Sequence, residues 1–252
     1  MKPAAVKSLI YKEFYMARKP LLIQTVSLIL FAVLGILVEL SFRIGNLALL
    51  PDTVLSEIKE MADFSVILFP VFMAGSFSYT ISEVSVKDEN IAWKRFCYTL
   101  PAGHMDFAMA KYLSMLLAIA VEIVISFAYV AAVCRVMGSP FSRVYLSYIL
   151  AVVALAAVMA VSNHIGILLF HTRDKAGLFM LGVILGISLI VVYFSGNFAV
   201  MDSGNMGLEN VSVRKEAMDA AAVNLLPWFA VMIGAVWVIG FLTSSMLYKR
   251  RE

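Results

Sequence analysis

Six long apolar runs constrain the fold of this chain more than any other feature. Hydrophobic residues make up 62% of its 252 positions and charged residues only 15%, whereas soluble domains have about 45–50% apolar and about 25% charged residues. A helix of about 20 apolar residues crosses the hydrocarbon core of a bilayer. The runs cover residues 20–40, 64–82, 112–133, 144–170, 177–196 and 226–248. The sequence therefore predicts an all-α membrane protein with six transmembrane helices in one domain, 20–252.

Basic residues indicate how the six predicted spans are oriented. Lys and Arg are more than twice as frequent in the N-terminal arm, the second loop, the fourth loop and the C-terminal tail as in the other three loops. Cytoplasmic loops carry this excess, so we expect both termini in the cytoplasm. The loop over 197–225 is then the longest outer loop. The small net charge of +3 reflects these basic residues, which are expected beside the inner leaflet of the membrane, and does not indicate a nucleic-acid partner.

The first 19 residues have the pattern of an amphipathic helix. Val6, Leu9, Ile10, Phe14 and Ala17 share one face at helical spacing. Most of the charged residues of this arm are expected on other faces, and Pro20 is expected to separate the helix from the first span. We predict a cytoplasmic interfacial helix over 1–19 that lies on anionic lipid, touches a partner protein, or does both.

A second amphipathic helix is predicted in the cytoplasmic loop, over 88–100. An apolar stripe is formed by Trp93, Phe96, Cys97 and Leu100, while Lys94 and Arg95 lie off it. Asp88 is a candidate N-cap and is followed by Glu89. Such a helix either lies on the lipid surface or docks its apolar face into a groove of a soluble partner.

Glu122 is the most unusual residue within the predicted spans. A carboxyl group near the middle of a span is costly unless it is neutral, paired or facing water. Asn163 and His164 lie deep in the next span and are candidate partners. The three residues form either a polar patch in a transport path or a hydrogen-bonded contact between two helices, worth about 0.6–2 kcal/mol.

Motifs for chemistry within the chain itself are missing. The sequence has no Gly-rich phosphate loop ending in Gly-Lys-Ser/Thr and no His-Glu-x-x-His. Its three histidines are not spaced as metal ligands. We therefore expect no catalytic residue, no metal and no cofactor in this chain.

The second loop resembles that of the membrane subunits of ABC exporters of the ABC-2 permease family. The resemblance rests on Asp88-Glu89, Trp93, Thr99-Leu100-Pro101 and Lys111-Tyr112. The overall plan is similar over nearly the whole length, with an N-terminal surface helix, six spans and a long last outer loop. Within the family, the chain is similar to small permeases made separately from their ATPase, such as exporters of phenol-soluble modulins, which are short amphipathic peptides.

The resemblance implies a bacterial cytoplasmic-membrane exporter in which two permease copies, expected to be a homodimer, each seat one ABC ATPase subunit. Residues 88–100 would be the coupling helix, the turn 172–175 with Arg173 and Asp174 a second contact, and the N-terminal helix a third. ATP and Mg²⁺ would bind to the ATPase. Spans rich in Met, Phe, Leu and Ala suit an amphipathic peptide or another apolar cargo.

Three other readings of the sequence stay open. A proton-coupled secondary transporter could use Glu122 and His164 as a relay and would need no ATPase. An intramembrane hydrolase could use the same pair, although it would need more convergent polar groups. A non-transporting accessory subunit would only act as a scaffold.

Overall fold

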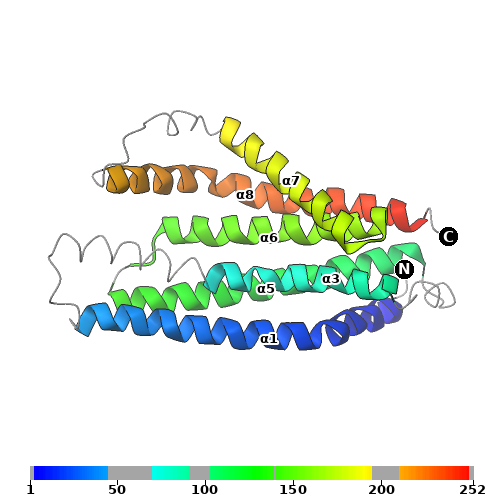
Figure 1. Cartoon of the computed structure of the whole chain (residues 1–252), viewed down its shortest axis with the longest axis horizontal. Coiled ribbons are helices and arrows are strands. Elements are labelled where there is room, and N and C mark those ends of the chain that lie inside the picture. The colour runs from blue at the N-terminus through cyan, green and yellow to red at the C-terminus, as the bar shows by residue number, and fades with distance from the viewer. Residues whose placement is uncertain (1–2, 45–69, 91–102, 139, 195–209, 250–252) are drawn as a thin grey trace.

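The computed structural model describes residues 3–44, 70–90, 103–138, 140–194 and 210–249. Within these ranges the chain is helical almost throughout and contains no strand. The helices lie roughly along one long axis, and the N- and C-terminal ends lie at the same end of the bundle (Figure 1). They are α1 (Pro3–Ile44), α3 (Ser76–Asn90), α5 (His104–Met137), α6 (Arg143–Phe170), α7 (Arg173–Phe194) and α8 (Asn210–Lys249).

Four of these helices are long and apolar enough to cross a membrane. The qualifying segments are Pro3–Ser41, His104–Met137, Arg143–Phe170 and Val223–Lys249, and they contain the first, third, fourth and sixth predicted spans. The second and fifth predicted spans fall partly outside the described residues, over 64–69 and 195–196. Most of their remaining length is helical, in a short segment over 70–74, in α3 and in α7.

The second predicted span is interrupted at Gly75. A turn at this residue separates the helical segment 70–74 from α3. A Cβ at Gly75 would lie 3.1 Å from Val152 Cγ1, so α6 passes close to the turn. The break gives α3 its own N-terminus inside the bundle, with N–H groups that need acceptors from elsewhere.

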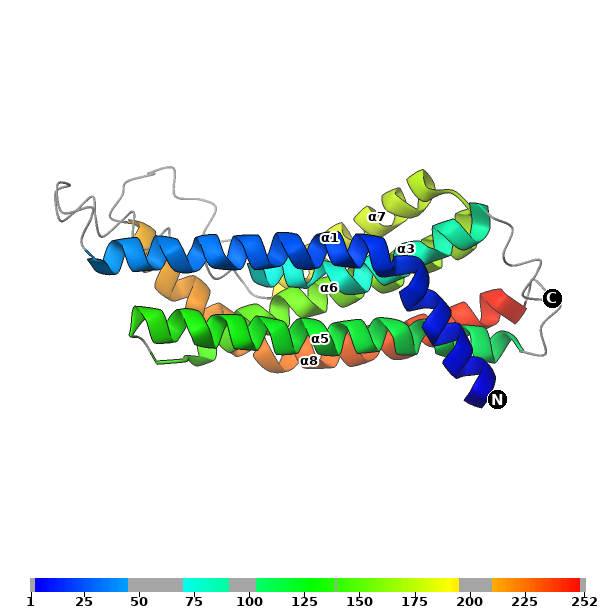
Figure 2. The ribbon, with the colours of Figure 1, turned by 90° about the horizontal axis from the view of Figure 1, so that it is seen from below.

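The predicted boundary at Pro20 is not a break in the structure. α1 is continuous from Pro3 to Ile44 with Pro20 inside it, and Figure 2 shows that its N-terminal part bends away from the rest of the helix. Pro20 lacks an N–H, so the carbonyl of Met16 loses its intrahelical donor. The Lys87 ammonium of α3 donates to that carbonyl at 3.2 Å, which explains how the helix continues past the proline.

The predicted outer loop 197–225 is shorter in the structure. α8 begins at Asn210, inside the predicted loop, and runs without interruption through Pro227 to Lys249. The last helix is therefore several turns longer at its N-terminal end than the predicted span 226–248.

Core packing depends on close approaches between helices. Val6 and Leu9 of α1 pack against Ala110 of α5, so the apolar face of the N-terminal helix is covered by protein. A second cluster joins α1, α3, α5 and α6 through residues such as Leu28, Ile81, Met115 and Val161.

Gly240 is the tightest of these contacts, and its replacement tests the packing of α8. A Cβ at this position would lie 2.4 Å from Val161 Cγ1 and 2.7 Å from the Tyr112 hydroxyl. We expect Gly240→Ala to lower the free energy of unfolding by about 1–3 kcal/mol through overpacking, measured as a lower thermal midpoint in detergent. Gly234→Ala in the same helix is the control, because nothing lies within 4 Å of its Cβ. Equal midpoints for the two variants would contradict this packing.

Candidate functional site

Helix α3 carries an unusual number of polar side chains for a helix inside an apolar bundle. Ser78, Thr80, Ser82 and Ser85 are all buried. Gln24 of α1 donates to the Thr80 hydroxyl at 2.6 Å, and the remaining polar groups meet α5, α6 and α7. These contacts, rather than an apolar stripe alone, position α3 among its neighbours.

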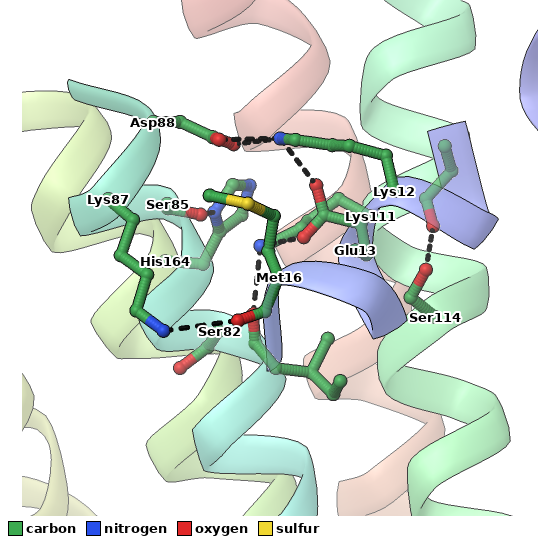
Figure 3. A network of polar contacts seen from close by, with 12 residues as sticks. Lys12, Glu13, Met16, Ser82, Ser85, Lys87, Asp88, Lys111, Ser114 and His164 are labelled. Carbon is green, nitrogen blue, oxygen red and sulfur yellow. Dashed lines mark hydrogen bonds and ion pairs between the residues drawn. The ribbon is translucent and has the colours of Figure 1, made fainter. Parts of the chain in front are cut away.

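Four charged residues form a compact network at the end of α3 that leads into the predicted coupling segment (Figure 3). Lys111 of α5 donates to Glu13 of α1 at 2.5 Å and to the Ile81 carbonyl of α3 at 2.9 Å. Lys12 donates to Glu13 at 3.2 Å and to both carboxylate oxygens of Asp88 at 2.5 Å. We call Lys12, Glu13, Asp88 and Lys111 the charge quartet. It contains two cations and two anions and ties α1, α3 and α5 together.

Burial and mutual attraction act against each other within the quartet. Burial favours the neutral form of Glu13, but Lys111 and Lys12 outweigh it, and the pKa of Glu13 is lowered. Burial also opposes the charge of Lys12, but Glu13 and Asp88 prevail and raise the pKa of Lys12. For Asp88, burial and the nearby Glu13 carboxylate raise the pKa despite the two lysines. Of the two carboxylates in the quartet, Glu13 therefore holds its charge more firmly than Asp88 does.

Asp88 does not act as the N-cap that the sequence predicts. It lies inside the last turn of α3, which continues to Asn90, and its carboxylate binds Lys12 instead of backbone N–H groups. Glu89 lies in the same turn. Trp93, Arg95, Phe96 and Leu100 fall within 91–102, outside the described residues, so the apolar stripe remains a prediction. The chain enters that segment from a helix end that is fixed to α1.

Asn163 and His164 do not bind Glu122, their predicted partner. Both reach α3 from α6: Asn163 donates to the Ser82 hydroxyl at 2.9 Å, and His164 Nδ1 lies 2.9 Å from the Ser85 hydroxyl. The His164 ring also lies edge-on to Tyr112, with centroids 5.9 Å apart. Together they fasten α6 to α3 at the level next to the charge quartet.

Glu122 binds α3 at its other end. Its Oε1 accepts a hydrogen bond from the backbone N–H of Ser78 at 2.5 Å. Ser78 lies in the first turn of α3, where N–H groups have no intrahelical acceptor, so Glu122 caps from another helix the N-terminus that the turn at Gly75 creates. Ser78 and Ser85 are two turns apart, and this separates Glu122 from His164 along α3.

Arg173 connects α3 to the turn between α6 and α7. Its guanidinium donates to Glu83 at 2.6 Å, although its side chain is 68% exposed. Tyr79 donates to the same Glu83 oxygen at 3.3 Å. Asp174 is exposed and lies in the first turn of α7. An acidic side chain at this position interacts favourably with the positive end of the helix dipole.

Sequence reasoning missed three members of the charge quartet as a site. Lys12 and Glu13 were expected mostly away from the apolar face, but Glu13 lies between Leu9 and Ala17 on the buried face. The signal was present, because residues 6, 9, 13 and 17 share one side of a helix. A single carboxylate on such a face requires a cation from another element, and Lys111 provides it.

No protein-family model matches the chain, and no curated protein matches it by sequence. Within the described residues, no group of three His, Cys, Asp or Glu side chains is arranged to hold a metal ion. The fold itself defines the class: in the part of the chain that the structure describes, the protein is helical and four helices can span a membrane.

Proposed function

We propose that this chain is the membrane-spanning subunit of an ABC exporter, with six transmembrane helices and both termini in the cytoplasm of a bacterial cell. A separate ATPase subunit would supply the energy, because the sequence contains no phosphate-binding loop. By resemblance to ABC-2 permeases, two copies of the chain would pair and seat two ATPases.

One observation carries the proposal: the segments expected to touch the ATPase all connect to α3. The predicted coupling segment, residues 88–100, begins in the last turn of α3, which ends at Asn90. The second predicted contact, at Arg173, is bound to Glu83 of α3. The third, the N-terminal part of α1, is bound through Lys12 to Asp88. A force on any of the three would therefore reach the same helix.

The contacts of α3 support one route for such a force. Hydrogen bonds from Ser82 and Ser85 reach α6, and Ser78 at the opposite end reaches Glu122 in the middle of the third predicted span. A helix held at both ends by polar contacts moves as a rigid element and carries displacement of one end to the other. ATP-driven closure of two docked ATPases would in this way shift helices that contain no nucleotide site.

A relay from Glu122 to His164 has less support. The two side chains bind α3 two turns apart, at Ser78 and Ser85, and no direct contact joins them. The secondary transporter therefore has less support than the ABC exporter.

Copurification tests the proposal. The tagged chain, solubilised in mild detergent without crosslinker, is expected to bring down a soluble protein that contains a Gly-rich phosphate loop. In vesicles the resulting complex should hydrolyse ATP faster when an amphipathic peptide is added, and a polar sugar is the control ligand. Uphill transport by the chain alone, without an ATPase, would contradict the proposal.

A further inference from the structure

The outward face of the N-terminal part of α1 carries aromatic and basic side chains. On the opposite face, Val6 and Leu9 pack against Ala110 of α5, so the apolar side of this helix is not available to lipid. Glu13 is the only acidic residue of 3–19, and it is buried in the charge quartet. The exposed aromatic and basic residues recur at helical spacing and are here called the tyrosine–arginine stripe: Lys7, Tyr11, Tyr15, Arg18 and Lys19.

Three side chains of this stripe are stacked on one another. The rings of Tyr11 and Tyr15 have centroids 6.2 Å apart and planes inclined by 26°. The guanidinium carbon of Arg18 lies 4.1 Å from the centroid of the Tyr15 ring. Cation–π attraction holds a guanidinium over a ring, and the N–H donors in its own plane stay available to a phosphate group. Arg18 is thus oriented by a neighbour while it remains exposed.

The stripe continues into an apolar surface of the same helix. Beyond Pro20, the exposed residues of α1 are apolar and recur at the same spacing, and they include Leu22, Val26, Ile29, Val33 and Leu37, which are 49–65% exposed. No residue from 20 to 38 is charged. A change along one face from apolar residues to tyrosine, lysine and arginine is typical of the boundary between hydrocarbon and headgroups.

The bend of α1 keeps the stripe near this boundary. A straight helix rises 1.5 Å per residue, so Lys7 would lie roughly 20 Å beyond Pro20 along the helix axis. The N-terminal part instead turns aside and crosses α5 (Figure 2), against which it packs. Its residues therefore stay nearer the level of Pro20 than a straight helix would place them.

We propose that the tyrosine–arginine stripe binds the headgroups of anionic phospholipids, with Arg18 on a headgroup phosphate. Lys7 and Lys19 add the attraction of an anionic membrane surface for cations. An acidic protein surface would also complement the basic residues, but it would not explain why the stripe continues into the apolar face of a membrane-spanning helix. This inference concerns the chain alone and does not depend on the proposed ATPase.

Lipid titration of the purified chain in mild detergent tests the proposal, with bound lipid counted by native mass spectrometry. We expect phosphatidylglycerol to bind more tightly than phosphatidylcholine with the same acyl chains. Arg18→Ala should lower the apparent affinity for phosphatidylglycerol about fivefold, the usual effect of one basic side chain at an anionic surface, and leave phosphatidylcholine binding unchanged. Arg173→Ala is the matched control, because this exposed arginine is paired with Glu83.

Three results of this titration would overturn the proposal. The first is equal affinity of the wild type for the two lipids. The second is an equal loss of phosphatidylglycerol binding in Arg18→Ala and Arg173→Ala. The third is displacement of phosphatidylglycerol by the same concentration of inorganic phosphate, which would indicate a site for a free anion.

Variants of Tyr15 test the part played by its ring. Tyr15→Phe keeps a ring beneath Arg18 and should bind phosphatidylglycerol like the wild type. Tyr15→Leu removes the ring and should lose part of the affinity that Arg18→Ala loses. Because Tyr15 is 48% exposed, both variants should have the thermal midpoint of the wild type in phosphatidylcholine. Wild-type affinity in Tyr15→Leu would overturn the role given to the ring.

A spin label in the stripe shows whether it faces lipid. Tyr11→Cys is labelled in a chain with Cys97→Ser and Cys134→Ser, and the chain alone is placed in vesicles that contain phosphatidylglycerol. Collisions with lipid-soluble oxygen should exceed those with a water-soluble nickel complex. Lys175→Cys, at an exposed position of α7, is the aqueous control. If the two labels were equally accessible to nickel, the stripe would face water and be open to a soluble partner, and the proposal would be wrong.

Discussion

Lys111→Met is expected to lower the free energy of unfolding by about 3–5 kcal/mol, the usual result of leaving a buried charge without its partner. Methionine fills a similar volume but cannot bind Glu13 or the Ile81 carbonyl, which Lys111 contacts at 2.5 and 2.9 Å. The Glu13 carboxylate would then retain only the longer contact to Lys12, at 3.2 Å. The effect is measured as a lower thermal midpoint in detergent. The midpoint is the temperature at which half of the monodisperse peak on size exclusion is lost.

Two companion variants show whether charge is the cause. Glu13→Leu combined with Lys111→Met removes both charges and should recover most of the lost stability, because a buried pair replaced by apolar groups is often neutral. Arg173→Ala removes a largely exposed ion pair and should change the midpoint little. If Lys111→Met melted like Arg173→Ala, the charge quartet would not be buried as described.

Phe96→Asp is expected to abolish ATP-driven export while the chain still inserts into the membrane. Phe96 and Trp93 belong to the predicted apolar stripe of the coupling segment, and aromatic residues of this kind dominate docking energies. Loss of such an anchor costs about 2 kcal/mol or more, which is roughly a thirtyfold weaker association with the ATPase. Trp93→Ala should act in the same direction. Export from vesicles and ATPase stimulation are measured together.

Lys94→Ala is the matched control for these variants, since Lys94 lies in the same segment but off the stripe. It should retain export and ATPase stimulation near the level of the wild type. If Phe96→Asp and Trp93→Ala both exported normally, residues 88–100 would not couple the two subunits. If Lys94→Ala lowered export as much as Phe96→Asp does, the loss would not depend on the apolar stripe. The assignment of the stripe as the docking surface would then be wrong.

The sequence predicts the helical class and most helix positions because hydropathy is a local property. The apolar runs over 112–133 and 144–170 correspond to α5 and α6, and the turn that interrupts the second span falls at Gly75, a residue whose backbone is conformationally permissive. Gly138 ends α5 in the left-handed conformation that glycine favours, with φ of 72°. In each case the residue and its immediate neighbours contain the information.

The contacts of polar residues could not be predicted in the same way, because their partners lie far away in the chain. Glu122 was assigned to Asn163 and His164 on the assumption that adjacent spans satisfy each other. The break at Gly75 instead presents a free N–H of α3 to Glu122, and the two α6 residues bind Ser82 and Ser85. Asp88 was read as a cap because short polar residues often precede helices, but Lys12, 76 residues away, determines its role.

The bend of α1 has a consequence for the evolution of this sequence. Pro20 creates the free carbonyl at Met16, and Lys87 of another helix binds it. A lineage that replaced the proline would restore the backbone bond and release the lysine from selection, whereas a lineage that first lost the lysine would leave a partly buried carbonyl without this donor. The two positions therefore constrain each other, and the order in which they can change is not symmetrical.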